Sequence, residues 1–217
     1  MTSNPQERRA AKLAAQLGAP AAQCLTEGRM HASVDAQETS AVSHGEISGE
    51  EVQKIFEADG IKVNNGAMTN KKTAQTLNLW HQALECGFNN RDEEMMKIMD
   101  EIMDDNVVFL APTYWKERRS KEFIKYALVG VSKAFKNFKY TRVFFHDDGF
   151  ALEFEANVET EDGPFLRGVD MVTVDPSTGK ITRFEVMCRP PKAVLKLLDF
   201  QTAFMRKVGL IPPAKKK

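Results

Sequence analysis

The feature of the sequence that most constrains the fold is a stretch in which apolar and polar side chains alternate. Every second residue from Phe150 to Val158 is apolar, and most of the residues between them are acidic or amide side chains. Successive side chains of a β-strand point to opposite faces of the sheet, so the pattern predicts a strand with one buried and one wet face. Such strands are typical of antiparallel sheets that cover a core on one side.

Turn-forming residues separate this strand from its neighbours along the chain. The β-rich segment from Tyr140 to His146 is followed by Asp-Asp-Gly, a sequence that favours a hairpin. Further turns at 161–164 and 175–179 lead to predicted strands over 165–174 and 181–189. The pattern therefore predicts a meander of long antiparallel strands.

Helical periodicity comes before the meander. Apolar residues recur at helical spacing in one segment that ends at Gly87 and in a second that opens near Asp92, and Ser120 can cap a third helix. The apolar run from Val107 to Leu110 is a predicted first strand, and Pro190 and Pro191 open a C-terminal helix. These elements together predict an α+β fold.

Composition divides the chain into three regions. Residues 1–72 contain Phe56 as their only aromatic residue, so they can bury little apolar area, and we predict a low-complexity, largely flexible extension. Residues 73–210 are the predicted domain, and residues 211–217 are a basic tail.

One segment of the extension resembles a calcium-binding loop. Ser40 to Glu51 has the Gly, Ile and Glu of such a loop, but Ser40, Val42 and His44 stand where carboxylates or amides should supply the first oxygen ligands. We therefore interpret it as a Gly-rich turn before a helix from about Gly49 to Ala58.

Charge and cysteine content exclude several classes of function. The 217 residues include 30 basic and 30 acidic side chains, so no net charge attracts nucleic acid or an anionic membrane. Cys24, Cys86 and Cys188 have no metal-binding or disulfide-framework spacing, which favours a reducing compartment, and we expect the cytoplasm. No apolar run is long enough to predict a membrane span. The histidines lack zinc-ligand spacing and no nucleotide-binding loop is present, so neither a metal nor a cofactor is predicted.

The segment from Gly168 to Leu197, GVDMVTVDPSTGKITRFEVMCRPPKAVLKL, resembles the ending of SnoaL-like proteins of the nuclear transport factor 2-like superfamily. The shared features are a Gly-Val-Asp strand, an Asp-x-x-x-Gly-Lys-Ile turn and a strand that closes on Arg-Pro. Residues 105–112 and the Lys-Tyr-Thr at 139–141 fit the same template. The resemblance implies a cone-shaped, curved antiparallel sheet wrapped around the N-terminal helices, with a ligand site at the mouth of the cone.

Two functions follow from this resemblance, because the superfamily hosts enzymes and non-catalytic proteins alike. The first is a SnoaL-like small-molecule-binding protein that takes an apolar, carbonyl-bearing ligand and, as an enzyme, acts as a cofactor-free isomerase, cyclase or dehydratase. The alternative is a non-catalytic module for dimerisation or protein interaction. The resemblance also implies a homodimer formed through the sheet.

Asp170 is the first candidate for a catalytic residue. It is in phase with Val172 and Val174, so on a concave face its carboxyl group lies among apolar neighbours, where burial raises the pKa of a carboxyl group and can keep it protonated. Steroid isomerases similar to this fold carry an oxyanion-stabilising Asp at the matching position. The alternative is a structural acid, satisfied by the backbone or by Arg183 or Arg189.

Other catalytic positions of those isomerases differ in this chain. Ala111 precedes Pro112 where the isomerases have a general-base Asp, and Trp80 stands where they have a tyrosine donor. His81 is the candidate replacement base, with a half-exposed position at the edge of the helix as the alternative.

Aromatic and sulfur-containing side chains complete the predicted ligand pocket. Tyr114 and Trp115 follow the first strand, so they either close over an apolar ligand or anchor their loop into the core. Trp80, Phe154 and Met187 are expected inside the cone. If these three side chains fill the cone instead of lining a cavity, the non-catalytic function is favoured.

Overall fold

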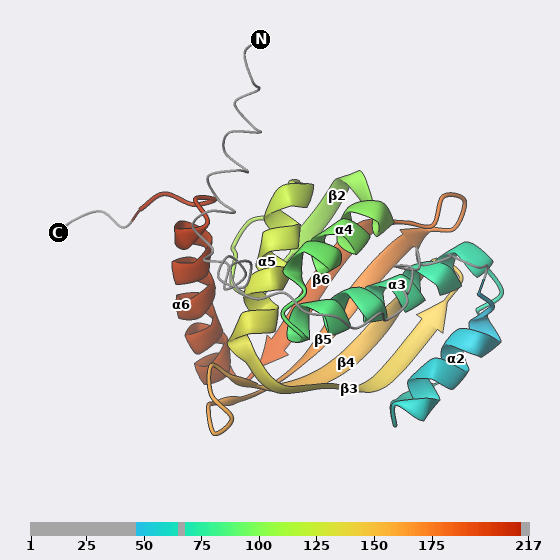
Figure 1. Ribbon diagram of the computed structural model, residues 1–217, viewed down its shortest axis with the longest axis horizontal. Coiled ribbons are helices and arrows are strands. Elements are labelled where there is room, and N and C mark those ends of the chain that lie inside the picture. Colours follow the sequence, from blue (N-terminus) through green and yellow to red (C-terminus); the bar gives the residue numbers. More distant parts are fainter. Residues whose placement is uncertain (1–46, 65–67, 214–217) are drawn as a thin grey trace, which may run out of the picture. The chain divides into compact units, whose positions relative to one another are not determined.

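The computed structural model describes residues 47–64 and 68–213 (Figure 1). Its helices are α2 (Gly49–Ala58), α3 (Lys71–Phe88), α4 (Asp92–Ile102), α5 (Lys121–Ala134) and α6 (Pro191–Lys207). Its strands are β1 (Lys62–Asn64), β2 (Met103–Leu110), β3 (Phe135–His146), β4 (Gly149–Val158), β5 (Phe165–Asp175) and β6 (Lys180–Arg189). The α+β class and the order of elements predicted from the sequence are confirmed.

The strands form one curved, unclosed sheet in the order β1-β3-β4-β5-β6-β2. Strands β3 to β6 pair antiparallel in succession, which confirms the predicted meander. The two edges differ from the expected antiparallel sheet, because β1 runs parallel to β3 and β2 runs parallel to β6. Both edge strands reach the sheet from helical segments, and the direction in which they arrive depends on long-range connections that local alternation does not encode.

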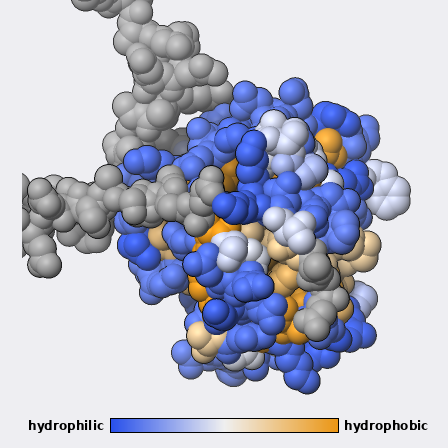
Figure 2. Space-filling view, turned by 90° about the vertical axis from the view of Figure 1, so that its right-hand side faces the viewer, coloured by the Kyte–Doolittle hydropathy of each residue, from blue (hydrophilic) through white to orange (hydrophobic). Residues whose placement is uncertain are grey.

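Helices α3, α4 and α5 lie against one face of the sheet, and α6 lies at one end of it (Figure 1). The apolar face of β4 points toward these helices, and Leu152, Phe154 and Val158 are all buried. From α3, Leu77 and Trp80 are fully buried on the same side. Each such side chain stabilises the fold by roughly 1.5–3 kcal/mol. Figure 2 shows a mostly hydrophilic surface in which hydrophobic side chains are confined to a few patches.

Polar side chains define where the helices begin. Asn70 accepts a hydrogen bond from the backbone N–H of Thr73 at the start of α3, and Ser120 accepts one from Phe123 at the start of α5, as predicted. Pro191 opens α6, where its missing N–H costs no intrahelical bond. No described helix combines the length and the hydrophobicity that crossing a bilayer requires.

The folded unit begins before the boundary predicted at Thr73. Two described elements precede that boundary and belong to the unit: α2 buries Val52 and Phe56, and β1 pairs with β3. The composition of residues 1–72 concealed this, because one aromatic ring and a few aliphatic residues are enough to attach a short helix to an existing core. The remainder of the predicted extension, residues 1–46, lies outside the described residues, as do 65–67 and tail residues 214–217.

Glu51, the last position of the calcium-loop resemblance, has a structural role at the start of α2. Ser48 and Glu51 form a capping box in which the Ser48 side chain accepts from the backbone N–H of Glu51 and the Glu51 carboxylate accepts from that of Ser48. The confirmed helix supports the interpretation as a turn before a helix, whereas residues 40–46 of the loop lie outside the described residues.

Candidate functional site

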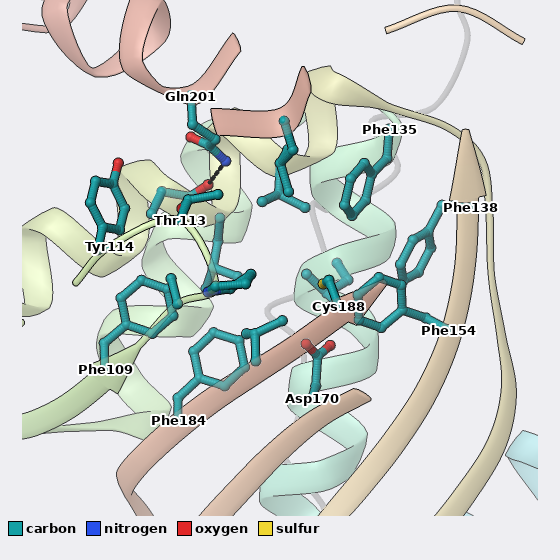
Figure 3. A pocket seen from close by; sticks show the side chains of 18 of the residues that line it. Phe109, Thr113, Tyr114, Phe135, Phe138, Phe154, Asp170, Phe184, Cys188 and Gln201 are labelled. Carbon is teal, nitrogen blue, oxygen red and sulfur yellow. Dashed lines mark hydrogen bonds between the residues drawn. The ribbon is translucent and has the colours of Figure 1, made fainter. Parts of the chain in front are cut away.

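An apolar cavity lies between the concave face of the sheet and helices α3, α5 and α6 (Figure 3). Aromatic rings form much of its lining, including Phe109, Phe135, Phe138, Phe154 and Phe184. The space open to the centres of water molecules is about 60 Å³. A single water needs roughly 10–15 Å³ by this measure, so the cavity has room for several waters or for a small organic ligand.

The carboxyl group of Asp170 lines this cavity. Its side chain points from β5 into the space between the aromatic rings, and the residue is only 7% exposed (Figure 3). Oδ2 accepts a hydrogen bond of 3.1 Å from the Tyr140 hydroxyl, whereas Oδ1 has no hydrogen-bond partner among the described residues. The burial predicted from strand phase is therefore confirmed. Among the described residues, neither Arg183 nor Arg189 forms an ion pair with Asp170, and Arg183 pairs with Glu185 instead.

Burial raises the pKa of Asp170 to about 7, and the hydrogen bond from Tyr140 opposes part of that rise. Removing water from a carboxylate disfavours its charged form, and the apolar lining offers little compensation. Near neutral pH the carboxyl group is therefore divided between its two protonation states. It can donate a hydrogen bond to a ligand in one state and accept a proton from it in the other.

Tyr140 and Trp80 fix the position of this carboxyl group through two successive hydrogen bonds. The Trp80 Nε1–H donates to the Tyr140 hydroxyl over 3.0 Å, and that hydroxyl in turn donates to Asp170. Burial and the negative charge of Asp170 raise the pKa of Tyr140 well above its ordinary value, so it remains a donor. Trp80 does not line the cavity as predicted. It is fully buried against Phe184 and fixes the orientation of Tyr140.

The role of Tyr140 was not predicted from the sequence. The pairing of β3 with β4 shifts register between Tyr140 and Arg142, so the alternation that identifies inward-facing residues is broken next to Tyr140. The only indication of its importance in the sequence was the Lys-Tyr-Thr at 139–141, which fits the SnoaL-like template.

His81 lies in a different groove from Asp170. Its Nε2 is 3.4 Å from Oδ2 of Asp59, and its ring packs 4.9 Å from the Phe56 ring, between centroids. Consecutive residues of an α-helix point about 100° apart, so α3 cannot direct both Trp80 and His81 toward the sheet. The structure therefore does not bring together the predicted Asp170 and His81 pair.

The remaining predicted pocket residues divide between the cavity and the surface. Phe154 and Tyr114 line the cavity, whereas Trp115 is 99% exposed and does not. Met187 is 55% exposed and lies beside Val169 on the outer face of the sheet, contrary to the expectation that it faces the cavity.

An irregularity in β6 explains the position of Met187. Thr173 pairs with Arg183 and Val174 pairs with Ile181, so Thr182 is an extra residue in the ladder. An extra residue exchanges the faces of all side chains beyond it. Cys188 consequently lines the cavity in place of Met187, and burial together with the charge of Asp170 raises the pKa of its thiol to about 12.

Two further polar side chains of the cavity were not predicted, Thr113 and Gln201. Gln201 comes from α6, whose predicted apolar face gave no indication of a buried amide. Among the described residues, no group of three His, Cys, Asp or Glu side chains is arranged to hold a metal ion.

No family model and no curated protein sequence matches the chain. The solved structures that resemble it include two with TM-scores above 0.5. One, with a TM-score of 0.53 and 27% identity, is a protein from Silicibacter pomeroyi with a cystatin-like fold, and the match covers 60% of this chain and 85% of that one. The other is a steroid delta-isomerase from Pseudomonas aeruginosa, with a TM-score of 0.54, 25% identity and coverage of 62% and 92%.

A nuclear transport factor 2-like protein of unknown function from Cytophaga hutchinsonii matches at a TM-score of 0.42 and 16% identity, over 59% of this chain and 97% of that one. The two stronger matches carry the assignment of the fold. The chain has the fold of the nuclear transport factor 2-like superfamily.

Proposed function

We propose that the chain binds a small, apolar, carbonyl-bearing molecule in the cavity, with Asp170 as its hydrogen-bonding and proton-exchanging group. The observation that carries this proposal is a carboxyl group in an apolar cavity, with one oxygen held by Tyr140 and the other without a partner among the described residues. The presence of a cavity with Asp170 in its wall favours this function over the non-catalytic module, for which a cone filled by side chains was expected.

Cofactor-free isomerisation is the reaction that the site supports best. Asp170 is the only carboxylic acid among the described residues that line the cavity, and none of these residues is a histidine. With a pKa of about 7, it can as a carboxylate take the proton from a carbon next to a carbonyl, and then return that proton to another carbon of the same ligand. The similarity to a steroid delta-isomerase supports this class of reaction. The small cavity favours a ligand smaller than a steroid.

The test is a thermal-shift screen of the full chain against small cyclic enones and aryl ketones. Compounds that raise the melting temperature of the wild-type protein are then measured on Asp170→Asn and on Asp162→Asn, a control that removes an exposed acid. We expect the stabilisation to be lost in the first variant and kept in the second.

Proton exchange is measured separately. Ligands that bind are incubated with the protein in deuterated water, and deuterium incorporated next to the carbonyl is followed by NMR. Incorporation that needs Asp170 supports catalysis. If no ketone stabilises the protein, or if both variants respond equally, Asp170 is not the ligand-binding group.

The outer face of the sheet supports a second proposal, that two copies of the chain dimerise there. Phe144, Ala151 and Met171 face one another across β3, β4 and β5, and Val169 and Met187 form a second apolar pair beside them. Phe144 is 43% exposed and Met187 55% exposed, although both are large apolar side chains. Contact between two such faces would bury these side chains.

The cysteines support a proposed cytoplasmic location. Cys86 and Cys188 are free thiols, one buried and one half-buried. Fractionation of cells that express the tagged protein tests this location.

A further inference from the structure

The cavity has a second polar end, away from Asp170. Tyr114 Oη and Gln201 Oε1 are buried atoms without a hydrogen-bond partner in the described part of the chain, and both residues line the cavity. Figure 3 shows the two side chains at the end of the cavity opposite Asp170. The large majority of buried polar side-chain atoms in proteins have a partner in the protein or in a bound water, so two unpaired atoms at one end of a cavity mark a place for a hydrogen-bonding group of a water molecule or a ligand.

The geometry around Gln201 leaves its amide oxygen as an acceptor. The residue is only 3% exposed, and its Nε2 donates to the backbone oxygen of Ala127 over 3.0 Å, which orients the amide. A Cβ atom at Gly130 would lie 2.5 Å from Oε1, so a glycine at that position of α5 is needed to accommodate the amide. Gln201 is therefore held in place by α5 with its acceptor unpaired.

Tyr114 supplies a donor at the same end. Its ring packs edge-on against Phe123 with 5.3 Å between centroids, and the Arg118 guanidinium lies 5.3 Å from the ring centroid. These contacts hold the ring in the loop that follows β2. Burial raises the pKa of Tyr114, so the hydroxyl keeps its proton at neutral pH.

We propose that Gln201 and Tyr114 form a subsite for a hydroxyl group of the ligand. The ligand hydroxyl donates to Gln201 Oε1 and accepts from the Tyr114 hydroxyl, so one group satisfies both unpaired atoms. A carbonyl or ether in its place leaves the Gln201 acceptor unpaired, and a carboxylate cannot donate to it. Together with the proposed function, on which the carbonyl end rests, the subsite defines the ligand class as small apolar ketones with a hydroxyl at the far end.

The experiment compares two pairs of probes that differ only in a distal hydroxyl. The first pair is propylbenzene and 4-propylphenol, and the second is 4-phenylbutan-2-one and 4-(4-hydroxyphenyl)butan-2-one. Dissociation constants for the full chain are measured by NMR titration or calorimetry. We expect the hydroxylated member of each pair to bind about tenfold more tightly, because its hydroxyl completes two buried hydrogen bonds.

Three variants test whether the subsite causes the tighter binding of the hydroxylated probes. Tyr114→Phe and Gln201→Met are expected to reduce the preference for the hydroxylated probes to about twofold or less while the probes without a hydroxyl bind as before. Tyr126→Phe removes a tyrosine hydroxyl of α5 that does not line the cavity; it is the matched control and should leave the preference for the hydroxylated probes unchanged. If Gln201→Met fails to fold because it loses the bond to Ala127, Tyr114→Phe decides the result.

The first pair has no carbonyl, so it tests the subsite independently of the proposed role of Asp170. If the phenol preference holds while Asp170→Asn binds both ketones as well as the wild type does, the subsite stands and the proposed function fails. If the ketones depend on Asp170 but neither pair shows a hydroxyl preference, the proposed function stands and the subsite is wrong. Absence of phenol binding, or a preference unchanged in both subsite variants, also overturns the subsite.

Discussion

At the scale of single residues, the chemistry of the cavity depends on two opposing effects at Asp170. Burial among aromatic rings disfavours the carboxylate, and the hydrogen bond from Tyr140 favours it. The hydrogen bond from Trp80 to the Tyr140 hydroxyl keeps that hydroxyl directed toward Asp170. The balance leaves a carboxyl group whose pKa of about 7 lets it gain and lose a proton near neutral pH.

The raised pKa of Asp170 predicts how stability depends on pH. The folded-state pKa of Asp170 is about 7, whereas that of an unperturbed aspartate is 3.8, so between these pH values the folded state binds more protons than the unfolded state. The contribution of Asp170 to stability therefore falls as pH rises from about 4 to about 7 and is constant above that range. An asparagine at this position has no proton to lose, so Asp170→Asn should not show this loss of stability.

Urea unfolding of both proteins at pH 5 and pH 8 measures the effect. At pH 8 we expect the variant to be more stable than the wild type, by roughly 4 kcal/mol at most, and the difference to shrink at pH 5. A difference that is the same at both pH values would show that burial does not raise the Asp170 pKa.

Tyr140→Phe tests the chain of hydrogen bonds behind the cavity. The substitution removes the donor that lowers the Asp170 pKa, so that pKa is expected to rise above about 7. It also leaves the buried Trp80 N–H without its acceptor, at a cost of about 1–3 kcal/mol in the free energy of unfolding. Carboxyl-carbon NMR titration measures the first effect and urea unfolding the second; Tyr126→Phe serves as the control. An unchanged Asp170 titration would contradict the assigned hydrogen bond.

At the scale of elements, α2 shows how a polar segment joins a core through very few side chains. Phe56 and Val52 are completely buried, although most of the residues around them on the helix are exposed or half-buried. The capping box of Ser48 and Glu51 sets where the helix begins.

Phe56→Ala is therefore expected to destabilise the folded unit by about 3–5 kcal/mol, because it leaves a cavity between α2 and α3. Lys54→Ala on the exposed face of the same helix should change stability by less than about 0.5 kcal/mol. Both values come from urea unfolding monitored by circular dichroism. Equal, small effects of the two substitutions would show that α2 does not contribute to the stability of the unit.

At the scale of the whole molecule, the exposed apolar side chains on the outer face of the sheet predict the oligomeric state. We expect the full chain to sediment as a dimer at micromolar concentration. Met187→Lys places a charge in the proposed interface and is expected to produce a monomer, because an unpaired charge is costly to bury. Glu93→Lys adds a similar charge on the exposed face of α4 and should leave the dimer intact. A wild-type monomer, or a Met187→Lys dimer, would contradict this interface.

The sequence by itself determined the elements whose patterns are local. Alternation along β4, turn residues between the strands and the cap at Ser120 are all properties of neighbouring residues, and each predicted its element correctly. Asp170 and Val172 are two residues apart on β5, and no irregularity lies between them, so they face the same side of the sheet. This local spacing correctly predicted that the carboxyl group of Asp170 is buried.

Only the tertiary structure decided which side chains meet in the cavity. The extra residue at Thr182 moved Met187 outward, the register shift beside Tyr140 brought its hydroxyl to Asp170, and the packing of α6 on α5 buried Gln201. The directions of β1 and β2 at the edges of the sheet were decided in the same way. Each of these outcomes depends on pairing between residues far apart in the chain, and the periodicity of a single segment carries no information about such pairing.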